Sequence, residues 1–177
     1  SLIDHQIEIV DTDGTAFYQF LMLFNSSSKT KRLPMRAAFV TDEDQFTESK
    51  HKEYYLVGLV KNSYEKLDFL REGINHDDVC SRVNNMRAMS NGQVGIKICS
   101  GKKTLEYQIC RANVFSKKET TKETWLYELI RQENSGGIDY VDSYMAGIGD
   151  RDLTEDEQQN VALLMWKCLP GKAEFAQ

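Results

Sequence analysis

The sequence predicts an α+β fold in which a mixed, mainly antiparallel sheet carries packed helices. Three observations lead to this prediction. The first third is rich in β-prone residues around an Asp13-Gly14 turn, and apolar residues recur at helical spacing later in the chain. No internal repeat or linker divides the sequence. We therefore expect a single domain over residues 1–177, with residues 150–177 as a C-terminal helical extension.

Strand and turn patterns dominate the first part of the chain, where residues 25–30 and 41–52 are expected to be loops. The expected strands are 6–10, 15–24, 33–40 and 53–61. The pattern then becomes helical, with a weak helix over residues 63–74 and a firmer one from Asn75 to about residue 90.

Beyond Asn91-Gly92 the sequence predicts a hairpin and two further helices. The hairpin arms are residues 94–98 and 105–109, in which apolar residues alternate. A helix follows from about Glu119 to Gln132, with Trp125 in its apolar stripe. Residues 138–149 are expected to be a loop with extended character. A last helix begins at the capping box formed by Thr154 and Glu157.

Composition describes an ordered chain. Its 177 residues are 41% hydrophobic and 28% charged, which excludes a disordered, low-complexity protein. No apolar run approaches the roughly 20 residues of a membrane-spanning helix. The net charge of −5 argues against a general nucleic-acid-binding protein, because such proteins carry an excess of Lys and Arg. A local basic patch is still compatible with this charge.

The first residue and the cysteines indicate what kind of protein the chain comes from and in which compartment it folds. It begins at Ser1 with no signal segment before Ile3, so we expect a piece of a longer protein. The four cysteines lack the paired spacing of a zinc site, and we expect free thiols in a reducing compartment. They are Cys80, Cys99, Cys110 and Cys168. Cys99 and Cys110 would lie on the two arms of the expected hairpin.

No standard catalytic motif is present, so we expect no enzyme activity, no cofactor and no metal. The histidines are far apart, and the acidic segment 42–48 is best explained as a solvated loop. Basic residues form three clusters, which could bind phosphate if loops brought two of them together and are otherwise ordinary exposed loops. The clusters are Lys29, Lys31 and Arg32; Lys102 and Lys103; and Lys117, Lys118 and Lys122.

An ordered series of short motifs runs through the second half of the chain. It consists of Ile96-Lys97, Gly101, Arg111-Ala112-Asn113, the apolar helix 126–130, Ile138, Met145-Ala146-Gly147-Ile148-Gly149 and Asp152-Leu153-Thr154. In order and spacing this series resembles the cap-binding middle domain of orthomyxovirus polymerase basic protein 2. The resemblance covers most of residues 53–154, whereas the first 50 residues match only in strand order.

The resemblance implies a pocket for the 7-methylguanosine cap of host messenger RNA, which a partner subunit cuts to make a primer. In such a pocket the cationic base lies between two aromatic rings, a carboxylate binds the guanine edge, and lysines hold the phosphates. The matching candidates are Phe39 for one ring, Glu53 for the carboxylate and Lys66 for the lysine. The second ring is missing, because the segment after Met89 carries none.

Losing one stacking face lowers affinity by roughly tenfold to a hundredfold. We therefore expect a divergent, thogotovirus-like domain that binds the cap weakly or not at all and has a structural or RNA-positioning role. The expected partners are the other subunits of a heterotrimeric viral RNA-dependent RNA polymerase, and RNA, including capped host mRNA. No membrane partner is expected, the domain alone would be monomeric, and the location would be the virion and host nucleus.

Three alternatives remain open at this stage. The first is a working cap site that uses Phe39 or Tyr55 with Glu53. The second is a pleckstrin-homology-like interaction module, because residues 103–132 read as a hairpin arm followed by a Trp-bearing helix, although the helical insert before Met89 speaks against it. The third is an enzyme with an unfamiliar set of catalytic residues.

Overall fold

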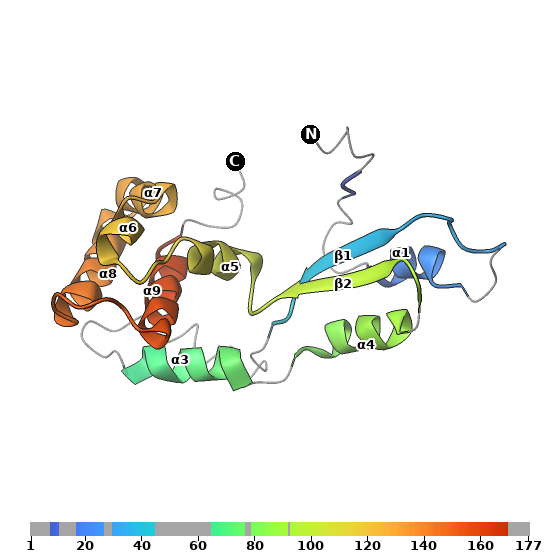
Figure 1. The fold of residues 1–177 in the computed structure, drawn as a ribbon, viewed down its shortest axis with the longest axis horizontal. Helices are drawn as coiled ribbons and strands as arrows, with labels where there is room; N and C mark the ends of the chain where they lie inside the picture. Colours follow the sequence, from blue (N-terminus) through green and yellow to red (C-terminus); the bar gives the residue numbers. More distant parts are fainter. Residues whose placement is uncertain are drawn as a thin grey trace. The chain divides into compact units, whose positions relative to one another are not determined.

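The computed structural model describes residues 8–10, 17–26, 30–44, 65–76, 79–91 and 93–169, and these residues are mostly helical (Figure 1). The described elements are α1 (Phe17–Phe24), β1 (Ala37–Asp42), α3 (Glu65–His76), α4 (Ser81–Ser90), β2 (Ile96–Gly101), α5 (Leu105–Ala112), α6 (Lys118–Lys122), α7 (Trp125–Glu133), α8 (Ser135–Gly147) and α9 (Glu155–Cys168). They belong to two compact units. Unit 1 comprises residues 1–41 and 81–100, and unit 2 comprises residues 42–80 and 101–177.

The sheet of the described residues has two strands, and they are parallel. The Ala37 N–H donates to the Gly95 carbonyl over 2.8 Å, and the Glu43 N–H donates to the Gly101 carbonyl over 3.0 Å. The pairing thus advances in the same direction along both strands, which requires a long crossover instead of a hairpin turn. The prediction of a mainly antiparallel sheet is therefore wrong, because β2 pairs with the distant β1 and not with its own neighbour in sequence.

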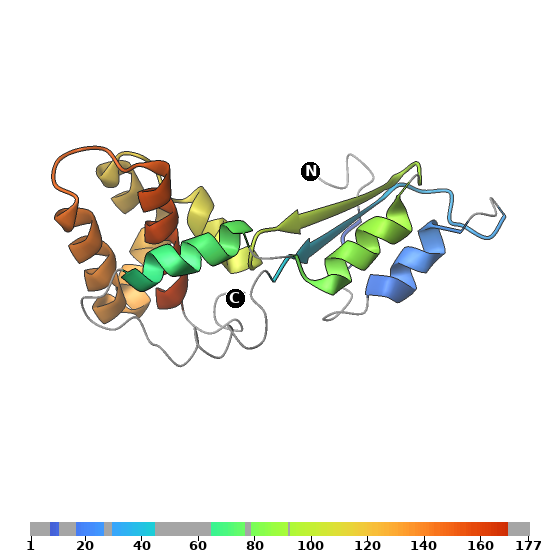
Figure 2. The ribbon, with the colours of Figure 1, turned by 90° about the horizontal axis from the view of Figure 1, so that it is seen from below.

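In unit 1, α1 and α4 lie on the same side of the sheet (Figure 2). Side chains alternate along a strand, so Phe39 of β1 faces the helices together with Ile96 and Ile98 of β2. Leu21 of α1 and Met86 of α4 complete a small core. The Phe39 ring packs edge-on against Phe24, with 5.9 Å between ring centroids.

Several predictions for the first part of the chain need correction. Residues 17–24, predicted as part of a strand, form α1, because this segment contains no β-branched residue and several good helix formers. The third predicted strand is present but shifted, at 37–42. The predicted strand at 53–61 lies outside the described residues. Asn75, predicted to begin a helix, belongs to the end of α3.

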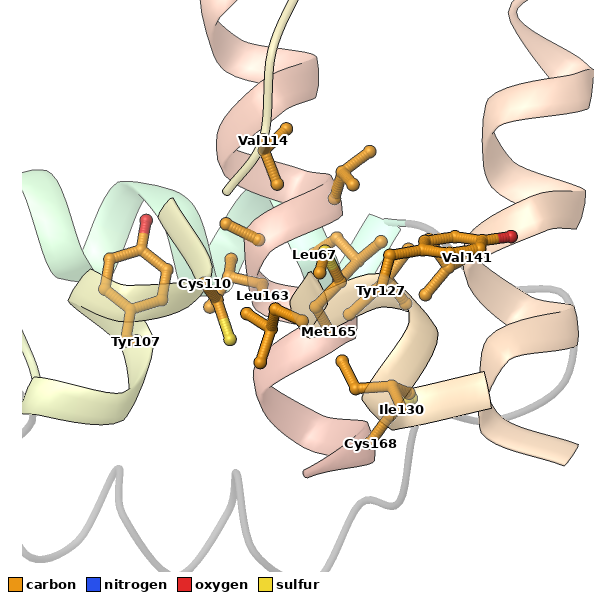
Figure 3. Close-up of a cluster of buried hydrophobic side chains, with 14 of the residues drawn as sticks. Leu67, Tyr107, Cys110, Val114, Tyr127, Ile130, Val141, Leu163, Met165 and Cys168 are labelled. Carbon is orange, nitrogen blue, oxygen red and sulfur yellow. The ribbon is translucent and has the colours of Figure 1, made fainter. Parts of the chain in front are cut away.

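Unit 2 is built around α9. All six residues 160–165 are buried, so this helix has no solvent-exposed side over nearly two turns. Helices α3, α5, α7 and α8 contact it. Figure 3 shows their side chains meeting those of α9 in one core. The labelled members are Leu67, Tyr107, Cys110, Val114, Tyr127, Ile130, Val141, Leu163, Met165 and Cys168.

The second arm of the predicted hairpin is the helix α5. The Thr104 hydroxyl caps it by accepting a bond from the Tyr107 N–H over 3.3 Å. Alternating apolar residues in this segment favour a strand, but Tyr107 and Cys110, three residues apart, are the pair that is buried. That spacing places both side chains on one helix face, where they reach the α9 core.

The predicted loop 138–149 is largely helical, since α8 covers most of it. Asn134 caps the helix by accepting a bond from the Gly137 N–H over 2.9 Å. A Cβ at Gly137 would lie 2.8 Å from the Cys168 Sγ, so glycine permits close packing on α9. Ile138, Val141 and Met145 supply the buried stripe.

The prediction of one helix over 119–132 is also wrong, because Thr124 caps a new helix at Trp125 and separates α6 from α7. Trp125 is 60% exposed instead of being in the apolar stripe. The predicted capping box of the last helix is confirmed: Thr154 and Glu157 exchange both bonds at the start of α9. The four cysteines are free thiols in the structure, as expected.

A polar contact fixes how α3 and α8 meet α9. Asn160 is buried, and its Nδ2 donates to the Asp68 carboxylate of α3 and to the Tyr144 hydroxyl of α8, each over 2.9 Å. Asp68 also accepts a bond from Arg71 over 3.0 Å. Because a buried N–H needs an acceptor, these two bonds favour the rotation of α9 that brings Asn160 to Asp68 and Tyr144, while the Asn160 Oδ1 has no partner among the described residues.

We expect Asn160→Ala to lower the free energy of unfolding by about 1–3 kcal/mol, because two hydrogen bonds of a buried group are lost. Urea unfolding followed by circular dichroism measures this change. Gln132→Ala is the matched control, since it removes an amide whose bond to Glu128 is exposed. A loss equal to that of the control would contradict a role for Asn160 in fixing the helices.

A second expectation concerns how the free energy of unfolding depends on pH in acid. The Arg151 guanidinium, together with the Thr154 backbone N–H, lowers the pKa of Glu157 from 4.5 to about 2. The stabilisation is therefore complete above pH 4.5 and is lost as the pH falls towards 2. In Glu157→Gln the free energy of unfolding should change less over this range than in the parent chain. Glu119→Gln, which removes an exposed carboxylate, should keep the parent's pH dependence.

Candidate functional site

The charge of the chain is unevenly divided between the two units. Unit 1 has seven Lys and Arg against four Asp and Glu, a formal charge of +3, whereas unit 2 has 15 against 23, a formal charge of −8. Within the described residues of unit 1, Glu8 is the one acidic residue. The basic ones are Lys31, Arg32, Arg36, Arg82, Arg87 and Lys97. Such asymmetry is typical of proteins that bind anionic partners.

Lys31, Arg36 and Lys97 are exposed, and Arg36 and Lys97 lie where β1 and β2 begin. Lys31 and Arg36 belong to the segment that leads from α1 into β1, and Lys97 is the second residue of β2. Arg36 passes the start of β2, because a Cβ at Gly95 would lie 3.7 Å from the Arg36 Cγ. Within the part of the chain that the structure describes, Lys31, Arg36 and Lys97 form no ion pair or side-chain hydrogen bond.

Lys97 lies on the face of the sheet opposite the helices. Residues that alternate with the buried ones point away from α1 and α4. This face carries Val40, which is 66% exposed, and the exposed side chains of Ala38 and Lys97. Parallel strands are usually covered on both faces, so a face that none of the described elements covers and that bears a cation is unusual for a purely structural sheet.

The other two basic clusters found in the sequence belong to unit 2. Lys103 is fully buried, although it was expected on a surface loop. The Lys118 ammonium donates to the carbonyls of Met145 and Gly149, at the C-terminal end of α8, where a cation offsets the helix dipole. Lys122 lies 3.5 Å from the Asp142 carboxylate. Lys118 and Lys122 therefore stabilise unit 2, whereas Lys31 of the first cluster and Lys117 of the third are exposed cations without partners among the described residues.

The three candidates for cap recognition are not brought together in the described structure. Phe39 is only 7% exposed and belongs to the core of unit 1, so its ring has no free face for stacking on a base. Glu53 and Tyr55 lie outside the described residues. Lys66 belongs to α3 of unit 2, and its side chain is not among those described.

Burial shifts the pKa values of several titratable groups in the core of unit 2. Burial raises the pKa of Tyr107 to about 12 and that of Cys168 to about 11, and it also raises the pKa of the Cys110 thiol. A thiol with a raised pKa stays protonated at neutral pH and is a poor nucleophile. No group of His, Cys, Asp or Glu in the described residues could hold a metal ion. No described helix is long and apolar enough to cross a membrane.

Of the exposed cations Lys31, Arg36 and Lys97, the sequence pattern indicated only Lys31. Lys31 and Arg32 were identified as one cluster, whereas Arg36 and Lys97 were not grouped with it. Arg36 and Lys97 are separated in the sequence by a crossover of more than fifty residues. Parallel pairing of β1 with β2, which no local pattern indicates, brings Arg36 and Lys97 to one sheet.

Comparison with protein-family models, curated proteins and solved structures gives no match to this chain. The resemblance to the cap-binding domain therefore rests on the ordered sequence motifs alone. In the structure those motifs lie on β2, at the end of α5, in α7, in and just after α8, and immediately before α9. Within the described residues they do not form the hairpin of the resembled domain, and no barrel closed by the Trp125 helix is present either.

The burial of Phe39 leads to a direct expectation for nucleotide binding. Calorimetric titration should give the same affinity for 7-methylguanosine triphosphate as for guanosine triphosphate, because the methyl group is recognised only through stacking. The affinity for both should fall with salt, since the phosphates make the contacts. A clear preference for the methylated nucleotide would contradict this expectation and favour the alternative cap site that uses Tyr55 with Glu53.

Proposed function

We propose that this chain is a non-catalytic RNA-binding domain whose unit 1 contacts the RNA phosphate backbone. The observation that carries the proposal is the basic charge of unit 1 in an otherwise acidic protein. Lys31, Arg36 and Lys97 are the residues that make the contacts. Their role is to hold and position RNA, and no residue of the chain is assigned a chemical step.

The electrostatics of unit 1 favour a polyanion over a single charged group. Each exposed cation attracts phosphate weakly in water, but several cations on one surface raise the local concentration of a repeating anion. Binding a polyanion also releases its condensed counterions, which favours association at low salt. The −8 charge of unit 2 opposes the approach of RNA, so the contacts are confined to unit 1.

The uncovered sheet face suits backbone contacts and not base recognition. Its described residues include a lysine and small aliphatic side chains but no aromatic ring on which a base could stack. Contacts to phosphate position a protein on RNA without selecting a sequence. We therefore propose RNA binding with little sequence preference and without cap recognition.

The proposal also includes membership of a viral RNA polymerase, which rests on different observations from those that support RNA binding. The ordered motifs between Ile96 and Thr154 support a domain of a viral RNA polymerase subunit, one that positions RNA next to the other subunits. The charge of unit 1 supports RNA binding without reference to that resemblance. RNA binding and polymerase membership can therefore be tested independently.

The test is fluorescence anisotropy of a labelled, unstructured RNA titrated with the full chain at several salt concentrations. Replacing Lys31, Arg36 or Lys97 with Gln should weaken binding at low salt. Each replacement should also reduce the slope of log affinity against log salt by about 0.7, the contribution of one phosphate contact on a single strand.

Lys117→Gln is the matched control, because Lys117 is an exposed cation of unit 2. It should leave both affinity and slope unchanged. An equal loss for Lys117→Gln and Arg36→Gln would show that only overall charge matters, and it would refute a site on unit 1. Binding that does not depend on salt would refute phosphate contacts altogether.

A further inference from the structure

Helix α1 exposes apolar side chains that a short surface helix would normally bury. Its sequence, FYQFLMLF, is apolar around nearly the whole helix. Leu21 faces the core of unit 1, whereas Met22 is 62% exposed and Leu23 is 48% exposed. A helix that is hydrophobic on all sides is normally covered on all sides.

The segment that follows α1 extends this apolar surface. The Leu33 N–H donates to the Leu23 carbonyl over 2.9 Å, so Leu33 lies directly beside the end of α1. Leu33 and Met35 are also exposed. We call Met22, Leu23, Leu33 and Met35 the α1 patch.

Basic residues are interleaved with the α1 patch. Lys31 and Arg32 precede Leu33, and Arg36 follows Met35. No acidic residue is present between residues 17 and 41. The patch is therefore an apolar surface with a positively charged border.

We propose that the α1 patch binds an amphipathic helix of a protein partner, one with an apolar stripe bordered by Asp and Glu. The apolar side chains would receive the stripe, and the basic border would pair with the carboxylates. Two of the four patch residues are methionines, whose flexible side chains adapt to the shape of a partner. The basic border shares Lys31 and Arg36 with the proposed RNA contacts, whereas the four apolar residues of the patch have no part in those contacts.

The charge of the patch argues against two other occupants, a second copy of the chain and RNA. In a symmetric dimer the same surface meets itself, so the basic border of one copy would face that of the other. RNA offers phosphates to the border but no apolar side chains to Met22 and Leu23. A partner with acidic and apolar residues matches both features of the surface.

The test uses the full chain and a fluorescein-labelled synthetic helix with leucines on one face and glutamates on the other. Two control peptides carry Lys in place of Glu, or Ser in place of Leu. Anisotropy should detect binding of the first peptide only. Met22→Gln and Leu23→Gln should each weaken it by about tenfold, the loss expected for one buried aliphatic side chain.

Val94→Gln is the control variant, because Val94 is an exposed apolar residue of unit 1 that is not part of the patch. It should bind the peptide like the parent chain, with circular dichroism confirming the fold of every variant. Equal binding of the Lys peptide, or no binding of the Glu peptide, would overturn the proposal. RNA binding by Met22→Gln should match that of the parent.

Two further measurements identify a different occupant. In sedimentation with phosphatidylcholine–phosphatidylserine vesicles, the parent chain should stay in the supernatant. In sedimentation velocity it should remain monomeric at increasing concentration. Vesicle binding or dimer formation that Leu23→Gln abolishes would replace the proposed partner with a lipid surface or a second copy.

Discussion

The burial of α9 is the constraint on which unit 2 depends. A helix with six consecutive buried residues has to be surrounded, and α3, α5, α7 and α8 supply the surrounding faces. Burying side chains such as Leu163 and Leu164 contributes roughly 1.5–3 kcal/mol each. Asn160 favours one rotation of α9 about its axis, because its amide hydrogen-bonds to α3 and α8 in that rotation. The glycine at 137 then lets α8 approach closely.

The sequence predicted α9 correctly because its capping box is a local pattern of four residues. It did not predict α5 or α8, and the reasons differ. In α5, Leu105, Tyr107 and Ile109 alternate as in a strand, and only the cap at Thr104 and the packing of Cys110 decide for a helix. In α8 two glycines suggest a break, although one of them is required by the contact with Cys168. Both outcomes depend on α9, which lies far along the chain.

Unit 1 presents the opposite situation, a small core and a large exposed surface. Its buried apolar residues are Leu21, Phe39, Val83 and Met86, whereas its charge and its exposed apolar side chains face outwards. The basic residues can be identified in the sequence, but the surface they form depends on the parallel pairing of β1 with β2. A ring that the sequence offered for base stacking, Phe39, is needed to hold this unit together. Unit 1 therefore has a small core beneath a largely exposed surface.

The central claim is that RNA contacts unit 1 and not unit 2, and amide chemical shifts test it directly. In a titration of the isotopically labelled chain with an unstructured RNA, the largest shifts should fall within residues 30–41 and 94–100. The amides of α6 to α9 should keep their positions. Shifts concentrated on α6 to α9, with residues 30–41 unaffected, would contradict the account.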